Sequence, residues 1–314
     1  MNKNYLLYAF FDRGGKIDFH VVDSLKRYNK FFQIIFISNI KITELERQKI
    51  RFVYKIIEDE HKEMDFGSWK IGIRFLKNRN VKNLALVNDS VIGPITSFRI
   101  ISERMKKEKI DFWGITSAGK DSRFHLQSYF LHFNERCFDH NCFKKFFKSI
   151  KQVHSKSELV KRYEIGLTQT LLSNGLKCNS YLPNFEKDIH SQEDCIDLFN
   201  KKELPFFKVK NIISNPYRLR MVDRVFKTLG HKEEYTSYIK RVNGSNSIFH
   251  LRYILPKFRK VILSKSFLII RAKFVCKNKL WRFYVKFLGI YIFFFIFPVK
   301  SNSRKVYTSD KNYK

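Results

Sequence analysis

The chain has 314 residues and 44% hydrophobic content, which fits one large domain, or one domain with an appendage, around a substantial core. Its 61 basic and 29 acidic residues leave a net charge of +32, which favours anionic partners. An AT-rich genome also enriches Lys, Asn, Ile and Phe, so part of the lysine excess has an explanation unrelated to function. The five cysteines form no CxxC pair, which argues against a zinc ribbon or a disulfide framework.

Apolar runs of strand length alternate with segments of helical periodicity through the first half of the chain. The first run, 5–11, is too short for a signal peptide and lacks a small-residue cleavage site, so it is predicted to be a buried strand. This alternation favours an α/β fold with a largely parallel sheet. Strands are expected over 5–11, 33–38, 52–57, 84–87 and 111–116, with helices over 18–31, from 43 onward, over 66–76 and over 98–107.

The second half continues less regularly. Residues 125–133 are predicted to form a strand, and helices are expected over 141–151 and 156–173. Asn174-Gly175 is a helix stop signal, since glycine adopts the left-handed conformation that follows many helices. A further strand is expected over 177–182, and 205–215 is predicted to be a linker or an edge segment.

Polar residues follow three of the predicted strands. They are Asp12, then Ser38-Asn39, then Asn88-Asp89-Ser90. Polar residues are common in loops, but the carboxyl ends of parallel strands meet at one edge of a sheet, where ligands bind. The sequence therefore predicts a binding site at this edge.

The triplet Asn88-Asp89-Ser90 has two interpretations. Oxygen ligands at a strand end suit a hard divalent cation, which in turn binds a diphosphate. Only Asp89 is ionised, however, and Mg²⁺ usually takes one or two carboxylates in addition to phosphate oxygens. The alternative is an Asx-turn that ends the strand. The spacing alone leaves both interpretations open.

The C-terminal region has a different composition. No acidic residue occurs between Glu234 and Asp310, where sixteen Lys or Arg residues are interleaved with apolar ones. The uncharged run Phe287–Val299 is shorter than the roughly 20 residues that a spanning helix needs. A basic, aromatic-rich helix lying in the lipid headgroup region is expected, and a buried helix with a solvated basic face is the alternative.

Seven pieces of the sequence stand in the order found in one known family, and they cover roughly residues 5 to 182. They are YAFFDRGGKID, the Ser38-Asn39 strand end, MDFGSWKIGI, LVNDSVIGP, DFWGIT, HLQSYFLHF and YEIGLTQTLLSNG. On these pieces the chain resembles the rhamnan synthesis F family of polysaccharide-assembly glycosyltransferases. The family is similar, more distantly, to inverting transferases with the GT-A nucleotide-sugar fold, so the resemblance implies a GT-A-like domain.

The resemblance also implies a donor side. In GT-A enzymes a helix leads into a strand that ends in an Asp-x-Asp metal motif, and Asn88-Asp89-Ser90 departs from that motif at both outer positions. Asp89 is the implied contact to a metal or a diphosphate. The leaving diphosphate needs charge stabilisation from a divalent cation, Mg²⁺ or Mn²⁺, or from Lys or Arg. The implied donor-binding residues are Asp12, Asn39, Asp65, Asn88, Asp89 and Ser90.

Inverting GT-A enzymes also carry a general base on a late helix, and YEIGLTQTLLSNG places Glu164 at that position. The chemistry asks for a carboxylate that takes the proton of the attacking acceptor hydroxyl. The alternative is a surface glutamate that pairs with Lys161 or Arg162. The implied acceptor-side residues are Trp113, His125, Gln127 and Tyr129.

The expected enzyme is a hexosyltransferase that moves rhamnose or a related hexose from a nucleotide-sugar donor to a growing cell-surface polysaccharide, such as capsule or O-antigen, or to a lipid-linked glycan. The expected organisation is a GT-A-like domain over 1–204, a linker with accessory helices over 205–245 and an α-helical membrane-associating region over 246–314. The protein is expected in the cytoplasm, bound peripherally to the anionic inner face of the plasma membrane.

Two other functions stay open. A non-catalytic assembly factor with the transferase fold would explain the altered triplet. A nucleic-acid-binding protein would explain the charge and the aromatic residues. The basic residues concentrate in an acid-free apolar tail, however, and no zinc-ligand or RNA-binding motif occurs, so no nucleic-acid partner is expected.

Overall fold

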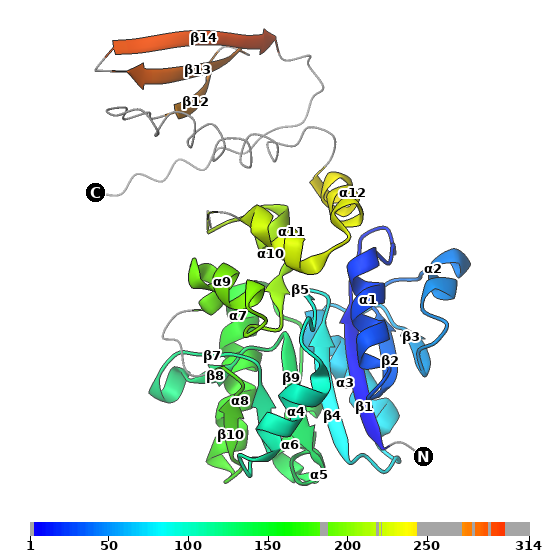
Figure 1. The fold of residues 1–314 in the computed structure, drawn as a ribbon. Helices are drawn as coiled ribbons and strands as arrows, with labels where there is room; N and C mark the ends of the chain where they lie inside the picture. Colours follow the sequence, from blue (N-terminus) through cyan, green and yellow to red (C-terminus); the bar gives the residue numbers. More distant parts are fainter. Residues whose placement is uncertain are drawn as a thin grey trace. The chain divides into compact units, whose positions relative to one another are not determined.

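A seven-stranded sheet organises the described part of residues 1–250, in the order β10-β6-β9-β4-β1-β2-β3 (Figure 1). Neighbouring strands of this sheet run parallel to each other, except that β9 is antiparallel to both of its neighbours. The sheet strands are β1 (Asn4–Phe10), β2 (Gln33–Ser38), β3 (Lys55–Glu58), β4 (Asn83–Asn88), β6 (Phe112–Gly114), β9 (Phe130–Asn134) and β10 (Cys178–Ser180).

The computed structural model describes residues 3–182, 188–217, 220 and 222–243, together with three later strands. The chain forms two compact units, residues 1–250 and residues 251–314. Within the described residues, no helix is both long enough and apolar enough to cross a membrane.

One face of the sheet is covered by α3 (Met64–Leu76), α6 (Asn141–Lys148) and α8 (Gly166–Ser173). Alternate strand residues such as Leu7, Ile35 and Leu86 form a core with Phe66 and Trp69 of α3, because successive strand side chains point to opposite faces. The Trp69 indole N–H donates to the carbonyl of Val87 at 3.2 Å. This bond ties α3 to the end of β4.

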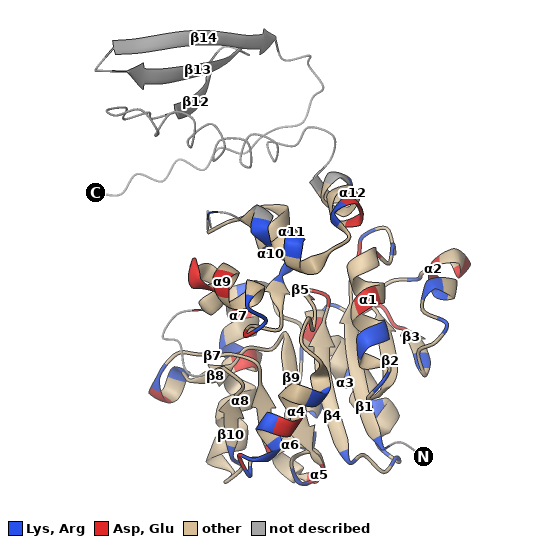
Figure 2. Cartoon of the chain, in the orientation of Figure 1, with Lys and Arg blue, Asp and Glu red and all other residues tan. Residues whose placement is uncertain are grey.

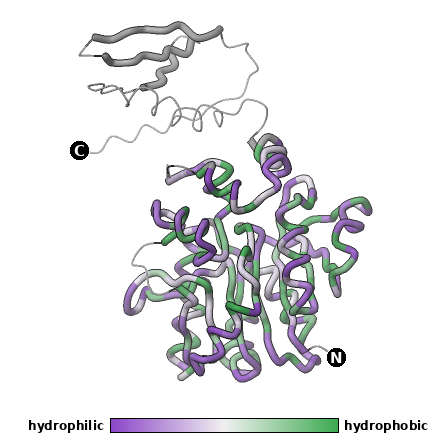
Figure 3. Tube along the Cα trace, in the orientation of Figure 1, coloured by the Kyte–Doolittle hydropathy of each residue, from purple (hydrophilic) through white to green (hydrophobic). Residues whose placement is uncertain are grey.

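The other face packs against α1 (Phe19–Tyr28) and α4 (Phe98–Lys106). Here the contacts are largely aromatic, with Tyr28 stacked on Phe130 at 6.2 Å between ring centroids and Phe98 against Phe130 at 5.9 Å. The sheet is therefore the buried middle layer of an α/β/α arrangement, which is why its strands are almost continuously apolar. Figure 3 shows these central strands as largely hydrophobic.

Smaller elements surround the carboxyl edge of the sheet. Two short antiparallel pairs, β5 with β11 and β7 with β8, extend the loops there, and α12 packs against α1 and α10. The bounds of these and the remaining short elements are β5 Val91–Ile92, β7 Ser117–Ala118, β8 His125–Leu126, β11 Phe207–Lys208, α2 Glu44–Lys49, α5 Glu135–Asp139, α7 Lys156–Leu159, α9 Asp194–Asn200, α10 Val209–Ile213, α11 Val225–Leu229 and α12 Lys232–Asn243.

The structure confirms the predicted alternation and the mostly parallel sheet. The bounds of β2 match the expected 33–38, and Gly175 ends α8 with a φ of +76°. The strand expected over 125–133 is instead two strands, β8 and β9. The peptide N–H of Gln127 donates to the carbonyl of Thr116 at 2.9 Å, which draws the intervening residues out of the sheet.

The prediction of a helix in the C-terminal region is wrong for the part of that region that the structure describes. Residues 272–298 contain three antiparallel strands, β12 (Ala272–Lys277), β13 (Leu280–Phe287) and β14 (Ile290–Pro298). The sequence LWRFYVKF alternates with period two rather than 3.6, and aromatic and β-branched residues favour strands. The predicted membrane association concerns this region and stays a prediction.

Gly93 fixes the close approach of β5 to β11, because its φ of +133° is accessible only to glycine and a methyl group there would lie 2.5 Å from the Pro205 carbonyl oxygen. We expect Gly93→Ala to lower the free energy of unfolding by about 3 kcal/mol, from overpacking and backbone strain together. Urea unfolding measures this change.

Gly175→Ala is the matched control, because Gly175 also has a positive φ but no atom lies within 4 Å of the added methyl group. It should cost only the left-handed strain of about 1 kcal/mol. Equal losses in the two variants would contradict the steric role of the Pro205 contact.

Candidate active site

The end of β4 is organised by the side-chain amide of Asn88, which is almost fully buried. Its Nδ2 donates to Asp65 Oδ2 at 2.8 Å. Its Oδ1 accepts from the Ser90 peptide N–H at 3.2 Å and from the Ser90 hydroxyl at 2.6 Å. One amide therefore joins the start of α3 to the turn that follows β4, so the Asx-turn and the contact to Asp65 occur together.

This arrangement explains why the triplet departs from Asp-x-Asp. An aspartate at position 88 would offer only acceptor oxygens to Asp65 and would bring two carboxylates within hydrogen-bond distance. The amide supplies the donor that the partly buried Asp65 needs. Asp89 is left as the ionisable residue of the triplet.

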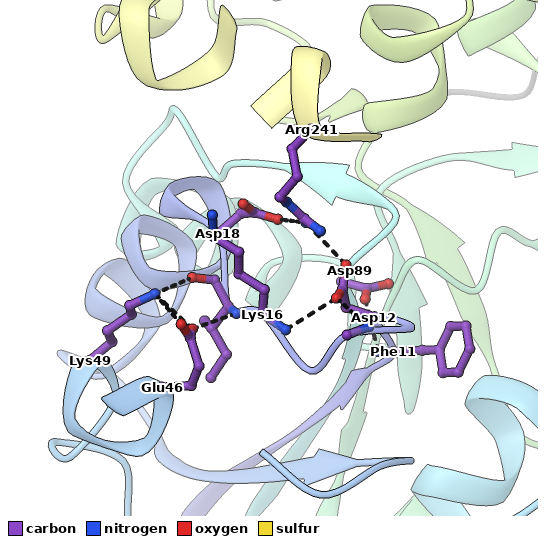
Figure 4. Close-up of polar contacts among 10 residues, drawn as sticks. Phe11, Asp12, Lys16, Asp18, Glu46, Lys49, Asp89 and Arg241 are labelled. Carbon is purple, nitrogen blue, oxygen red and sulfur yellow. Dashed lines mark hydrogen bonds and ion pairs between the residues drawn. The ribbon is translucent and has the colours of Figure 1, made fainter. Parts of the chain in front are cut away.

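Asp89 connects β4 to the loop that follows β1. Its Oδ2 accepts the peptide N–H of Phe11 at 2.9 Å (Figure 4). Burial raises the pKa of Asp89 to about 7, and the negative charge of Asp65 adds to this shift. The carboxyl group of Asp89 therefore changes charge near neutral pH.

The β1–α1 loop is held by Asp12, whose Oδ1 accepts the peptide N–H groups of Gly14 at 2.9 Å and Lys16 at 3.1 Å. Arg241, near the end of α12, donates to Asp12 Oδ2 at 3.0 Å and also to Asp18 (Figure 4). Burial opposes ionisation of Asp12, but these hydrogen bonds outweigh it and lower its pKa. The arginine thus joins α12 to the loop after β1.

A cavity of about 330 Å³ opens at this edge of the sheet. Its wall contains three carboxylates, from Asp12, Asp18 and Asp89, and the hydroxyl of Ser90. Aromatic rings from Phe10, Phe11, His20 and Tyr238 line other parts of it. Its cationic lining residues are Lys16, Lys156, Lys208 and Lys210.

Lys208 is positioned by a polar network next to the cavity. Its Nζ donates to Asp188 Oδ2 at 3.1 Å and lies 5.4 Å from the centroid of the Tyr129 ring. The Thr116 hydroxyl donates to Gln127 Oε1 at 2.6 Å and lies 2.8 Å from the Tyr129 hydroxyl. The predicted acceptor-side residues Gln127 and Tyr129 therefore share one network with a cavity-lining lysine.

Burial opposes ionisation of Asp188, but the positive charge of Lys208 outweighs it and the pKa of Asp188 falls to about 2. The neighbouring His190 is fully buried, and burial together with the charge of Lys208 lowers its pKa to about 3. The imidazole is thus neutral at pH 7, which leaves Lys208 as the charge that keeps Asp188 ionised.

Glu164 lies in a π-helical turn, Val160–Ile165, which joins α7 to α8 without a break. Such turns occur often at functional sites. Glu164 Oε1 accepts the peptide N–H of Ser128 at 2.7 Å, and one turn later Thr168 Oγ1 accepts that of Leu126 at 3.2 Å. The carboxylate thus points at the loop before β9.

Asp65, at the start of α3, is subject to opposing effects. Burial raises its pKa and the charge of Glu164 adds to that shift, while the hydrogen bond from Asn88 and the charge of Lys156 oppose it. Of the two surface partners considered for Glu164, Arg162 donates to Glu158 at 3.4 Å, and the Glu164 carboxylate accepts the Ser128 peptide N–H.

Of the eleven predicted site residues, three line this cavity, namely Asp12, Asp89 and Ser90, and Glu164 is not among the lining residues. Three of the others have contacts elsewhere. Asn39 Oδ1 accepts the peptide N–H of His61 at 2.7 Å and so holds the loop before α3. Trp113 is buried in the core, with its ring 4.9 Å from that of His132. The Nδ1 atom of His125 lies 2.8 Å from the carbonyl oxygen of Arg123. The cavity lining includes none of the three.

A family model described as rhamnan synthesis protein F matches residues 34–295. The chain belongs to this family. The uncharacterized protein y4gN of Sinorhizobium fredii is 28% identical over 183 residues, which span 56% of this chain and 45% of that relative. The chain thus matches less than half the length of this relative.

Solved structures with weaker likeness include core-mannan synthase A of Aspergillus fumigatus in a Mn/GDP form, with 11% identity, a TM-score of 0.35 and coverage of 56% of this chain and 72% of that one. A protein of Desulfovibrio desulfuricans described as a nucleotide-diphospho-sugar transferase has 11% identity and a TM-score of 0.37, and covers 84% of this chain and 98% of its own. These scores are too low to support an inference about this rhamnan synthesis protein F family member.

The residues of this family member fit a divalent cation poorly. Among the residues that the structure describes, no three His, Cys, Asp or Glu side chains are placed to hold a metal ion. Asp89 supplies a carboxylate at the triplet, while the Asn88 amide and the Ser90 hydroxyl bond to each other. Four lysines line the same cavity. The donor set suits an anionic ligand better than a cation.

The residues missed in the sequence are those cavity lysines and Arg241. In a chain with 61 basic residues, a single lysine carries no signal of its own. Figure 2 shows Lys and Arg distributed over many helices and loops, so their convergence becomes visible only in the folded chain. One local pattern in the sequence indicates two of these lysines. In the segment Lys208–Val209–Lys210, lysine alternates with a valine that is buried in the structure.

The Asp188–Lys208 pair gives stability that depends on pH. The pKa of Asp188 is lower in the folded protein than its ordinary 3.8, so its contribution is present above pH 3.8 and is lost as pH falls toward 2. We expect Asp188→Asn to lower the free energy of unfolding by about 2 kcal/mol at pH 7, and the loss to shrink toward pH 3.

Urea unfolding of both proteins at pH 7, 5 and 3 measures this difference. Asp139→Asn is the control, because the exposed pair of Asp139 with Lys144 should contribute at most about 1 kcal/mol. A loss for Asp188→Asn that is the same at every pH would show that the ionised carboxylate is not its cause.

Proposed function

We propose that this member of the rhamnan synthesis protein F family is a glycosyltransferase with a GT-A-like nucleotide-sugar site. The observation that carries the proposal is the cavity at the carboxyl edge of the sheet, where Asp89 and four lysines line one space. Ligands of open α/β sheets bind at this edge. Lysines suit the diphosphate of a nucleotide-sugar donor, because ammonium groups are common phosphate ligands.

The proposed chemistry is a direct displacement at the anomeric carbon. An acceptor hydroxyl oxygen attacks that carbon while its bond to the diphosphate oxygen breaks. The hydroxyl proton passes to the carboxylate of Glu164, and the electron pair of the broken bond leaves with the nucleoside diphosphate. Cationic groups aimed at the diphosphate stabilise the charge that develops there.

The geometry around Glu164 suits a base. Its Oε1 is fixed by the Ser128 peptide N–H at 2.7 Å, so the carboxylate has one orientation and can offer Oε2 to a hydroxyl. The loop that carries Ser128 also carries Gln127 and Tyr129, which we propose shape the acceptor side. The acceptor is proposed to be a growing polysaccharide or lipid-linked glycan, and the donor sugar rhamnose or a related hexose.

A second candidate is a non-catalytic assembly factor with this fold. The hydrogen bond between the Ser128 peptide N–H and Glu164 also supports this candidate. Together with Thr168, Glu164 holds the backbone of β8 and the loop that follows it, which is a structural role. The two candidates differ in one respect. A structural carboxylate can be replaced by an amide that accepts the same hydrogen bond, whereas a base cannot.

We therefore expect Glu164→Gln to lower sugar transfer by about 100-fold or more while donor binding and thermal stability stay unchanged. Gln Oε1 can still accept the Ser128 N–H. The measurement is transfer from a panel of nucleotide sugars to a glycan acceptor, with donor affinity determined separately.

Glu103→Gln, an exposed residue of α4 paired with Arg99, is the matched control and should retain full activity. Full transfer by Glu164→Gln would remove it as the base. No transfer or donor hydrolysis by the unmodified protein with any donor would favour the assembly factor.

We also propose that the basic C-terminal region binds the anionic inner face of the plasma membrane from the cytoplasm. Sixteen Lys or Arg residues without an acidic residue between Glu234 and Asp310 support this, since each basic residue near an anionic surface contributes about 1 kcal/mol. The proposal requires only charge and aromatic content, so it does not depend on a helix.

The full chain is expected to co-sediment with phosphatidylserine-containing vesicles at low salt and to be released at high salt, because the attraction is screened. A chain that ends at His250, the boundary of the first compact unit, should stay in the supernatant. Equal binding by the shortened chain would show that the tail is not the anchor.

A further inference from the structure

The cavity holds more positive charge than its own carboxylates compensate. Asp12 and Asp18 both bond to Arg241. Lys208 is paired with Asp188 at 3.1 Å. With these partners included, the site holds five cationic groups, Lys16, Lys156, Lys208, Lys210 and Arg241, and four carboxyl groups, Asp12, Asp18, Asp89 and Asp188.

Lys156 and Lys210 both line the cavity. Lys156 begins α7 and Lys210 lies in α10, so the fold brings two lysines from distant segments to one space. Burial lowers the pKa of Lys210, the charge of Asp188 opposes this shift, and the positive charge of Lys156 adds to it. Like charges in one cavity repel each other, and a bound anion offsets that repulsion.

The position of Lys210 is firmly determined. The peptide N–H of Val209 donates to the Ser90 carbonyl at 2.9 Å, next to Asp89. The Nζ of Lys210 lies 2.6 Å from the hydroxyl of Tyr217 and donates to it. The start of α10 is therefore fixed beside the triplet, and the ammonium group of Lys210 is held in one position by Tyr217.

We propose that Lys156 and Lys210, with Lys16 and Lys208 beside them, bind the donor diphosphate and stabilise its departing charge in place of a divalent cation. This inference rests on the proposed transferase function. It also follows from the donor set, since Asp89 is the carboxylate of the triplet and its Oδ2 accepts the Phe11 N–H.

The first test is titration of the full chain with pyrophosphate, UDP, GDP and dTDP by calorimetry, in EDTA and then with Mg²⁺ or Mn²⁺. We expect at least one nucleoside diphosphate to bind in EDTA, with an affinity that changes by less than about twofold when the cation is added. Binding that requires the cation would overturn the lysine proposal.

The second test uses Lys156→Gln and Lys210→Gln. Each should weaken diphosphate binding by about tenfold, since a charge-assisted hydrogen bond is lost. Lys161→Gln, an exposed position on the same continuous helix, should leave affinity unchanged. Unchanged affinity in both test variants would also overturn the proposal.

Thermal unfolding of the unliganded protein separates this role from a structural one. Lys156→Gln removes both the repulsion with Lys210 and the attraction to Asp65, so its melting temperature should stay close to that of the unmodified chain. A lower melting temperature together with weaker binding would indicate a structural role. If none of the four probes binds in any buffer, the proposed donor site itself fails, whereas binding only with a cation leaves the transferase function standing.

Discussion

The carboxyl edge of the sheet depends on one buried amide, that of Asn88. It donates to the Asp65 carboxylate and accepts from Ser90, so the start of α3 and the turn after β4 are fixed by a single side chain. An ionised carboxylate cannot do both, because the two contacts need a donor on one side and an acceptor on the other, and an amide has both at every pH. Asp89 is thereby held against the β1 loop through the Phe11 N–H.

This constraint has a consequence for the charge of the site. A carboxylate at position 88 would help to bind a divalent cation, but it would stand against the Asp65 carboxylate, which disfavours it. In the proposed transferase the compensating charge for the diphosphate comes from lysines, and β11 with α10 contributes Lys208 and Lys210 to the cavity lining. The β5–β11 pairing and the close contact at Gly93 therefore matter to the chemistry as well as to the fold.

Much of the fold follows from local sequence patterns. Buried parallel strands such as β2 are continuous apolar runs, and Gly175 is a helix stop that needs no tertiary information. The thirteen-residue run Phe287–Val299 is uncharged throughout, so it has no polar periodicity that would distinguish a strand from a helix. The alternation in β13, which precedes most of that run, is the sequence signal for strands in this region.

The site is less accessible to such reasoning, because its key contacts join residues far apart in the chain. Asp12, Asp89 and Ser90 end neighbouring strands, and parallel topology alone brings them to one edge. No comparable rule brings Lys156 to Lys210. Most lysines of the described residues are exposed, Lys156 among them, so exposure alone does not single out a functional lysine. The informative lysines are those whose like-charged neighbours raise the cost of ionisation. Folding gains nothing from that repulsion, whereas the binding of an anion gains from the positive charge.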